Sequence, residues 1–125
     1  MRRFTNSHEW IELDGQEGTV GVTAYAQKEL GEIVFVNLPD VGTTVATGDE
    51  AVILESTKAA ADIYAPVSGV ITAVNHSVKE SPDLLNQSPE GEGWLYKISL
   101  TNSKEIDQLI SWDEYEKMVK NSFSS

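Results

Sequence analysis

The sequence predicts a mainly β domain, a sandwich or barrel, with short flanking helices and a helix at the C-terminus. Turn residues recur about every ten positions through the first hundred residues, and the short segments between them are rich in valine and isoleucine. Near residue 103 the apolar spacing changes to the i, i+3, i+4 pattern of helices. No linker or low-complexity tract interrupts the chain, so residues 1–125 are expected to form one domain, with the sandwich at about 8–100 and the helical segment at about 103–120.

The first forty residues predict strands interrupted by one short helix. Residues 10–13 alternate and end at Asp14-Gly15, a dipeptide typical of hairpin turns, and residues 18–23 form the next strand. Thr23 can cap a helix over residues 24–30, because its hydroxyl can accept a hydrogen bond from an unpaired N–H of the first turn. Gly31 suits the end of that helix, and residues 32–38 predict another strand.

The rest of the chain continues as short strands and then changes to helices. Strands are predicted at residues 44–46, 51–55, 62–65, 70–74 and 94–100. Helices are predicted at residues 81–86, 103–110 and 112–120. In the last of these, Asp113 and Glu114 in the first turn and Lys117 and Lys120 near the end suit the helix macrodipole. Residues 121–125 are expected to fray.

Composition excludes several classes of function. The chain has no cysteine, so disulfides, thiolate metal sites and cysteine nucleophiles are absent, and any sulfur redox chemistry must come from a cofactor. His8 and His76 lie too far apart in sequence to suggest a metal site. The net charge of −11 argues against nucleic acid and anionic membranes, and it favours attraction to basic partner surfaces.

No segment predicts export or membrane insertion. The longest apolar runs fall well short of the roughly 20 residues that cross a bilayer. Arg2 and Arg3 are followed by no apolar stretch of signal-peptide length, so a cytoplasmic, bacterial-type protein without a signal or transit peptide is expected.

The sequence contains no convincing catalytic set. Ser7, His8 and Glu9 have the composition of a hydrolase triad, but consecutive residues rarely adopt triad geometry. The stretch Gly91-Glu92-Gly93 lacks the following helix and lysine of a phosphate-binding loop. A stand-alone enzyme is therefore not expected.

Lys58 is the most distinctive residue. It is the only lysine or arginine between Lys28 and Lys79, it has small neighbours, and it falls at the tip of a predicted hairpin. An exposed, solvated lysine is the ordinary interpretation. A catalytic amine needs burial or a nearby cation to lower its pKa, whereas Glu55 and Asp62 would keep this amine charged. The setting favours a lysine that another enzyme recognises and acylates.

Together with Lys58, several stretches closely resemble the H protein family of the glycine cleavage system. The resemblance extends from about residue 7 to the C-terminal helix, nearly the whole chain. The matching stretches are His8-Glu9-Trp10, residues 31–39, residues 55–60 around Lys58, residues 62–69, and Gly93-Trp94.

This resemblance implies a lipoyl/biotinyl-type β-sandwich, also called a barrel-sandwich hybrid. In the family, the lysine that matches Lys58 carries lipoic acid in amide linkage. The implied function is a non-catalytic, monomeric carrier that takes the aminomethyl group of glycine from glycine decarboxylase (the P protein, which uses pyridoxal phosphate) to aminomethyltransferase (the T protein, which uses tetrahydrofolate). Dihydrolipoyl dehydrogenase (the L protein) then reoxidises the arm, and lipoyl-attaching enzymes are further partners.

The resemblance also implies a groove for the loaded arm. Family groove residues match Ser7, Glu9 and Asp62, and Tyr64 is expected as a further wall. A carboxylate of Glu9 or Asp62 could accept a charge-assisted hydrogen bond from the terminal amine. Ala61 replaces a serine common in the family, which would remove a hydroxyl beside the groove.

Three alternatives stay open at this point. An H-like lipoyl relay protein in lipoate assembly would be lipoylated without carrying one-carbon units, and the Ala61 replacement leaves room for it. A biotin carrier is disfavoured, because Thr57 and Ala59 replace the methionines that usually flank a biotinyl lysine. An interaction module with an unmodified Lys58 is the third.

Overall fold

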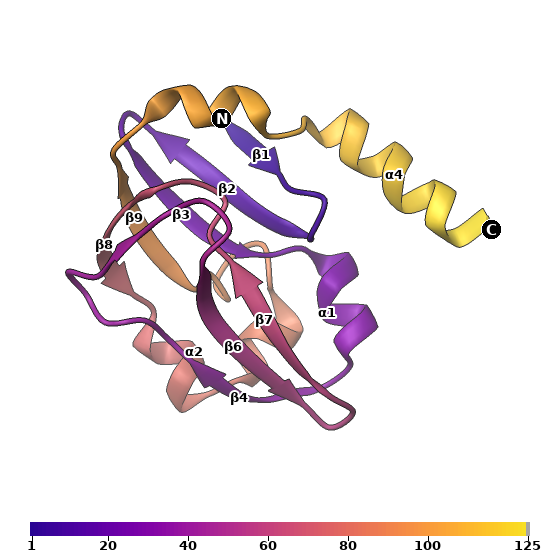
Figure 1. Cartoon of the computed structure of the whole chain (residues 1–125). Coiled ribbons are helices and arrows are strands. Elements are labelled where there is room, and N and C mark those ends of the chain that lie inside the picture. Colours follow the sequence, from indigo (N-terminus) through magenta and orange to yellow (C-terminus); the bar gives the residue numbers. More distant parts are fainter. Residues whose placement is uncertain (125) are drawn as a thin grey trace.

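Two antiparallel sheets make up most of the chain, with short helices at their margins (Figure 1). The computed structural model describes the backbone of residues 1–124 and the side chains of residues 1–120. The prediction of a mainly β sandwich is confirmed. Among the described residues, no helix is long and apolar enough to cross a membrane.

The larger sheet has six strands in the order β1-β2-β3-β9-β8-β5. The bounds are β1 Arg2–Phe4, β2 Glu9–Asp14, β3 Glu17–Val22, β9 Tyr96–Leu100, β8 Gly69–Val74 and β5 Thr44–Val45. The sequence did not predict β1, because two of its three residues are arginines and only Phe4 is buried. This strand depends on pairing with β2, in which Phe4 lies opposite Trp10.

The smaller sheet has three strands in the order β4-β6-β7. The bounds are β4 Ile33–Asn37, β6 Glu50–Ser56 and β7 Ala60–Tyr64. Alternate residues of β6 and β7 face the core, as the period-2 pattern predicts, whereas in β4 a bulge separates the two buried residues by three positions. The buried ones are Ile33, Val36, Val52, Leu54 and Ile63. They pack against Ile11, Val20, Ile71 and Ile98 of the larger sheet in one continuous apolar core.

Helix α1 (Ala24–Leu30) has the predicted caps. The Thr23 hydroxyl accepts from the N–H of Ala26 at 3.2 Å, and Gly31 ends the helix at a φ of 85°, which is in the left-handed region that favours glycine. Helix α3 (Asp83–Gln87) matches the expectation at residues 81–86. Helix α2 (His76–Glu80) was not predicted, because five residues with one buried side chain, Val78, show no measurable period.

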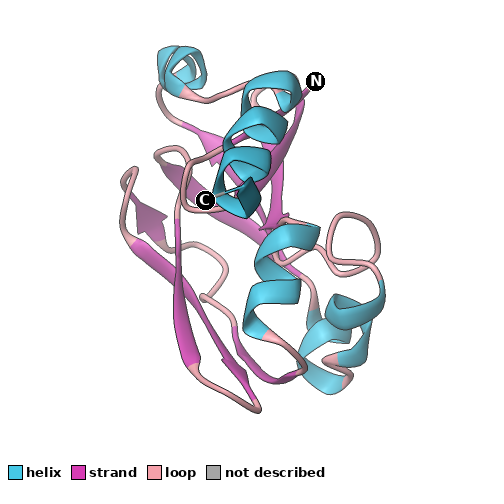
Figure 2. Cartoon of the chain, turned by 90° about the vertical axis from the view of Figure 1, so that its right-hand side faces the viewer, coloured by secondary structure: helices cyan, strands magenta, loops and turns pink. Residues whose placement is uncertain are grey.

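The C-terminal helices differ from the predicted ones in type and length. The first is a 3₁₀ helix, η1 (Ser103–Gln108), which ends before the predicted residue 110. The second, α4 (Trp112–Ser124), continues past residue 120. It therefore includes most of the segment expected to fray, while Ser125 lies outside the described residues. Tyr115 of α4 packs with Phe4 and Trp10 in a second apolar cluster, which attaches this helix beside β1 (Figures 1 and 2).

Candidate functional site

Lys58 lies in the turn between β6 and β7, at the tip of a hairpin that projects from the body of the molecule (Figure 1). Its side chain is exposed. The Ser56 hydroxyl organises the turn, because its oxygen accepts from the N–H of Lys58 at 3.1 Å and from the N–H of Ala59 at 3.0 Å. The same hydroxyl donates to the Ala59 carbonyl at 3.1 Å. The predicted placement of Lys58 at a hairpin tip is confirmed.

The hairpin tip rests against the end of α1. The N–H of Thr57 donates to the carbonyl of Glu32 at 3.0 Å. A Cβ at Gly31 would lie 3.4 Å from Cε of Lys58, so the lysine stem passes over this glycine. The turn is thus fixed at its base while the amine remains accessible.

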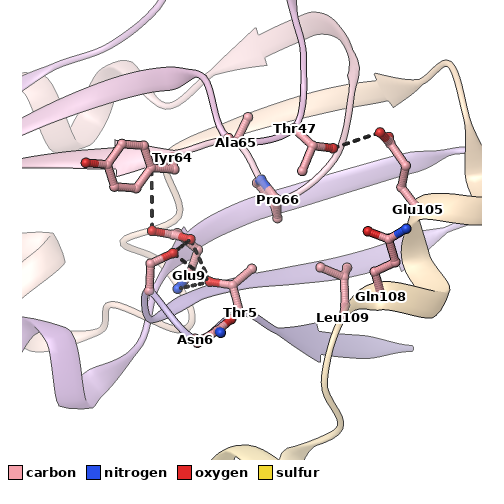
Figure 3. A pocket seen from close by; sticks show the side chains of 12 residues that line it. Thr5, Asn6, Glu9, Thr47, Tyr64, Ala65, Pro66, Glu105, Gln108 and Leu109 are labelled. Atoms are coloured by element: carbon pink, nitrogen blue, oxygen red, sulfur yellow. Dashed lines mark hydrogen bonds between the residues drawn. The ribbon is translucent and has the colours of Figure 1, made fainter.

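A cavity of about 430 Å³ lies near the other end of β7, and residues from four separate parts of the chain line it (Figure 3). These are Thr5, Asn6, Ser7 and Glu9; Thr47 and Gly48; Tyr64, Ala65 and Pro66; and Glu105, Gln108 and Leu109. The structure therefore brings together three of the predicted groove residues, Ser7, Glu9 and Tyr64. The sequence did not predict the contributions of Thr47 or of η1, since nothing local marks them as neighbours of Glu9.

Glu9 is the central polar residue of the cavity. Only 1% of its surface is exposed. One carboxylate oxygen, Oε1, accepts hydrogen bonds of 2.6 Å from the hydroxyls of Thr5 and Ser7. The other, Oε2, has only a long contact of 3.5 Å from the N–H of Tyr64. None of the ion pairs among the described residues involves Glu9, so a buried carboxylate retains one oxygen with unused acceptor capacity beside a cavity.

The outer face of β7 connects Lys58 with this cavity. Ala60, Asp62 and Tyr64 alternate along that face and are exposed. Asp62 does not line the cavity itself; it lies two residues before Tyr64, on the same face of the strand. Ala61 lies opposite the buried Leu54 and so faces inward. A serine at position 61 would not face this path, contrary to the expectation from the sequence.

Ser7, His8 and Glu9 do not form a triad. His8 has a φ of 73°, and its Nδ1 lies 2.8 Å from the Tyr115 hydroxyl, whereas the Ser7 hydroxyl donates to Glu9. The hydroxyls of Tyr115 and Thr23 share a second hydrogen bond of 2.6 Å. Burial lowers the pKa of His8, and burial raises the pKa of Tyr115 to about 12. These residues connect α4 with the start of α1 and leave the Ser7 hydroxyl free to bind Glu9.

Glu105 fixes the η1 wall of the cavity. Its Oε1 accepts from the N–H of Ser68 at 2.7 Å, and its Oε2 accepts from the hydroxyls of Ser68 and Thr47, both at 2.8 Å. Burial would raise the pKa of Glu105, but the hydrogen bonds from Ser68 and Thr47 outweigh it and hold that pKa below its ordinary value. An ionised carboxylate therefore joins η1 to two turns of the sandwich.

Comparison with known proteins gives a consistent result. A family model described as "Glycine cleavage H-protein" matches residues 2–122. The chain belongs to this family. It is 48% identical over 118 residues to a glycine cleavage system H protein of Carboxydothermus hydrogenoformans, covering 94% of this chain and 91% of that protein. It is 43% identical over 116 residues to the one of Thermotoga maritima, covering 93% and 94%.

A solved structure agrees with the fold. The crystal structure of a glycine cleavage system H protein from Mycobacterium marinum superposes with a TM-score of 0.88 at 37% identity, covering 95% of this chain and 96% of that one. Membership of the family implies the role of a carrier subunit with a lipoyl cofactor, in a system with P, T and L proteins. The residues described above fit such a group. An exposed lysine with small neighbours lies just before β7, and the other end of β7 borders a cavity lined by the buried Glu9, whose carboxylate takes part in none of the ion pairs within residues 1–120.

Proposed function

We propose that Lys58 carries lipoic acid in amide linkage and that the chain is a single-domain, monomeric carrier of the aminomethyl group of glycine. Its partners would be the P protein as donor, the T protein as acceptor and the L protein as oxidant. The bound lipoyl group supplies a disulfide that accepts the aminomethyl group and a dithiol that is later reoxidised. The residues of the chain hold the root of the arm and bind its loaded tip.

The position and environment of Glu9 are the observation that carries this proposal. A buried carboxylate without a cationic partner is costly, and a protonated amine is the ligand that would compensate its charge. Glu9 lines a cavity of about 430 Å³, and a terminal ammonium group there would donate a charge-assisted hydrogen bond to its Oε2. Thr5 and Ser7 hold the carboxylate in place through Oε1.

The remaining residues have supporting roles. Lys58 fixes the root of the arm, and the Ser56 turn keeps that root in one place. Asp62 and Tyr64 would guide the arm along the outer face of β7. Once an arm fills the cavity, Leu109 and Pro66 reduce the access of water to its tip. Tethering raises the local concentration of the tip at each partner's active site.

The experiment is an exchange assay with the purified, lipoylated chain. Incubation with an active P protein, glycine and labelled bicarbonate should place label in the carboxyl carbon of glycine. A lipoylated chain that supports no exchange would refute the carrier function. If that chain also donates its lipoyl group to 2-oxoacid dehydrogenase domains, it is the relay protein of lipoate assembly.

A further inference from the structure

Exposed apolar side chains gather on the outward side of the smaller sheet. The exposed fractions are 51% for Val34, 48% for Phe35, 38% for Ile53 and 38% for Tyr64. These four, which we call the outer face, are more than half of the seven large apolar residues exposed within residues 1–120. Several exposed apolar residues on one face of a sheet are typical of an interaction site, whereas single exposed apolar residues are not.

Strand register explains why these side chains share one side. Ile53 lies opposite Asn37 of β4 and opposite Asp62 of β7, so it is central on the sheet. A bulge between Ile33 and Phe35 breaks the alternation of β4, and both Val34 and Phe35 stay exposed. Figures 1 and 2 show the helices on the other sides of the molecule, with none over this face of β6 and β7.

The charged side chains on the strands of the smaller sheet are all acidic. The three strands and the residue before them carry acidic side chains and no basic ones: Glu32, Glu50, Glu55 and Asp62. Lys58 is the only cation between Lys28 and Lys79, and acylation would remove its charge. A complementary partner therefore has an apolar contact surrounded by lysine and arginine.

The outer face lies close to the amine of Lys58, the group that would be acylated. Thr57 donates to Glu32 at 3.0 Å, and the Lys58 stem passes over Gly31, only three residues before Val34 in the chain. The bare lysine side chain is short, so an enzyme that acts on it must bring its own surface against the hairpin. A partner that meets the far end of a long acyl arm can remain farther away.

We propose that the outer face is the docking surface for the enzyme that acylates Lys58, a ligase with a basic rim around an apolar contact. The proposal rests on lipoylation of Lys58. In the reaction, Nζ attacks the carbonyl carbon of a lipoyl adenylate and a C–N bond forms. The bond from that carbon to the phosphate oxygen breaks, AMP leaves with the electron pair, and the nitrogen loses a proton.

The test measures initial rates of lipoylation against the concentration of the chain, with lipoate–protein ligase, ATP and lipoic acid. Val34→Ser and Ile53→Ser should each raise KM about tenfold with little change in kcat, because they remove contact and leave the amine in place. The matched control is Val41→Ser: Val41 is 59% exposed but lies in the loop after β4, so its KM should be unchanged. Added salt should raise the KM of the wild-type chain.

Each other outcome has a definite meaning. An unchanged KM in both face variants, with normal acylation of the wild-type chain, would overturn the docking surface alone. A wild-type chain that gains no lipoyl group at saturating ligase would overturn both proposals. A wild-type dimer that dissociates in the face variants, seen by sedimentation, would make this face an interface between copies and overturn its assignment to the ligase. Urea unfolding should show that these surface variants have the same transition midpoint as the wild-type chain.

Discussion

The β7 strand has two ends with opposite character. At its start, Lys58 is exposed in a turn of small residues, whose hydrogen bonds within residues 1–120 come from the Ser56 hydroxyl and the backbone. At its end, Tyr64 borders a cavity that contains a buried carboxylate and walls from distant parts of the chain. One end is accessible to enzymes, and the other can exclude water from a small charged group.

This contrast suggests how one rigid strand can serve two needs of a carrier. An attachment residue must be reachable, which requires small neighbours and a fixed backbone. A labile cargo must be shielded, which requires burial and a charge of opposite sign. The two requirements conflict at a single position, and separation along β7 satisfies both.

The largest effect is expected at the accessible end. Lys58→Arg keeps the positive charge but gives a guanidinium that lipoyl-attaching enzymes cannot acylate. Intact mass should show one lipoyl adduct on the wild-type chain and none on the variant, with complete loss of glycine exchange. An adduct that persists in Lys58→Arg would place the attachment elsewhere.

The second-largest effect is expected at the cavity end of β7, on the rate at which water hydrolyses the loaded arm. Glu9→Gln removes the charge that would hold the terminal ammonium, so water should release ammonia and formaldehyde from the loaded chain about tenfold faster. Glu92→Gln, on an exposed loop, is the matched control and should match the wild-type rate. Equal rates for Glu9→Gln and the wild-type chain would show that Glu9 does not hold the cargo.

A smaller change is expected from the turn itself. Ser56→Ala removes a hydroxyl that accepts from two N–H groups and donates to one carbonyl. The free energy of unfolding should fall by about 1 kcal/mol in urea titrations, because the turn is exposed and water replaces part of the loss. Ser99→Ala, on an exposed position of β9, should change it by less than about 0.5 kcal/mol. If Ser56→Ala and Ser99→Ala lowered the free energy of unfolding equally, the Ser56 hydroxyl would not organise the turn.

The smallest effect concerns the η1 wall and depends on pH. The folded pKa of Glu105 lies below its ordinary value of 4.5, so its contribution is present at pH 7 and is lost as pH falls through the lowered pKa. Glu105→Gln should therefore be less stable than the wild-type chain at pH 7, by under about 1 kcal/mol because solvent screens a partly exposed carboxylate. Urea titrations from pH 7 to below the lowered pKa would measure this difference in the free energy of unfolding. A difference that stays constant over that range would contradict the stabilising role of the ionised Glu105 carboxylate.

Much of the fold followed from local sequence signals. Alternation and turn residues predicted most of the strands, and the caps of α1 at Thr23 and Gly31 were predicted correctly because capping involves neighbours in sequence. The missed elements, β1 and α2, are short and have one buried residue each, Phe4 and Val78. Such short elements form only because strands and helices elsewhere in the fold pack against them, and a local sequence pattern does not show these partners.

The sequence by itself determined the small-residue turn and the isolated lysine at its tip, because a hairpin depends on residues close together in the chain. Only the tertiary structure decided how the cavity is composed. It placed Ser7, Glu9 and Tyr64 together, left Asp62 on the strand outside, turned Ala61 inward, and added Thr47 and Glu105. The physical reason is that these residues meet through the pairing of two sheets and the docking of η1, and those contacts have no signature in local sequence.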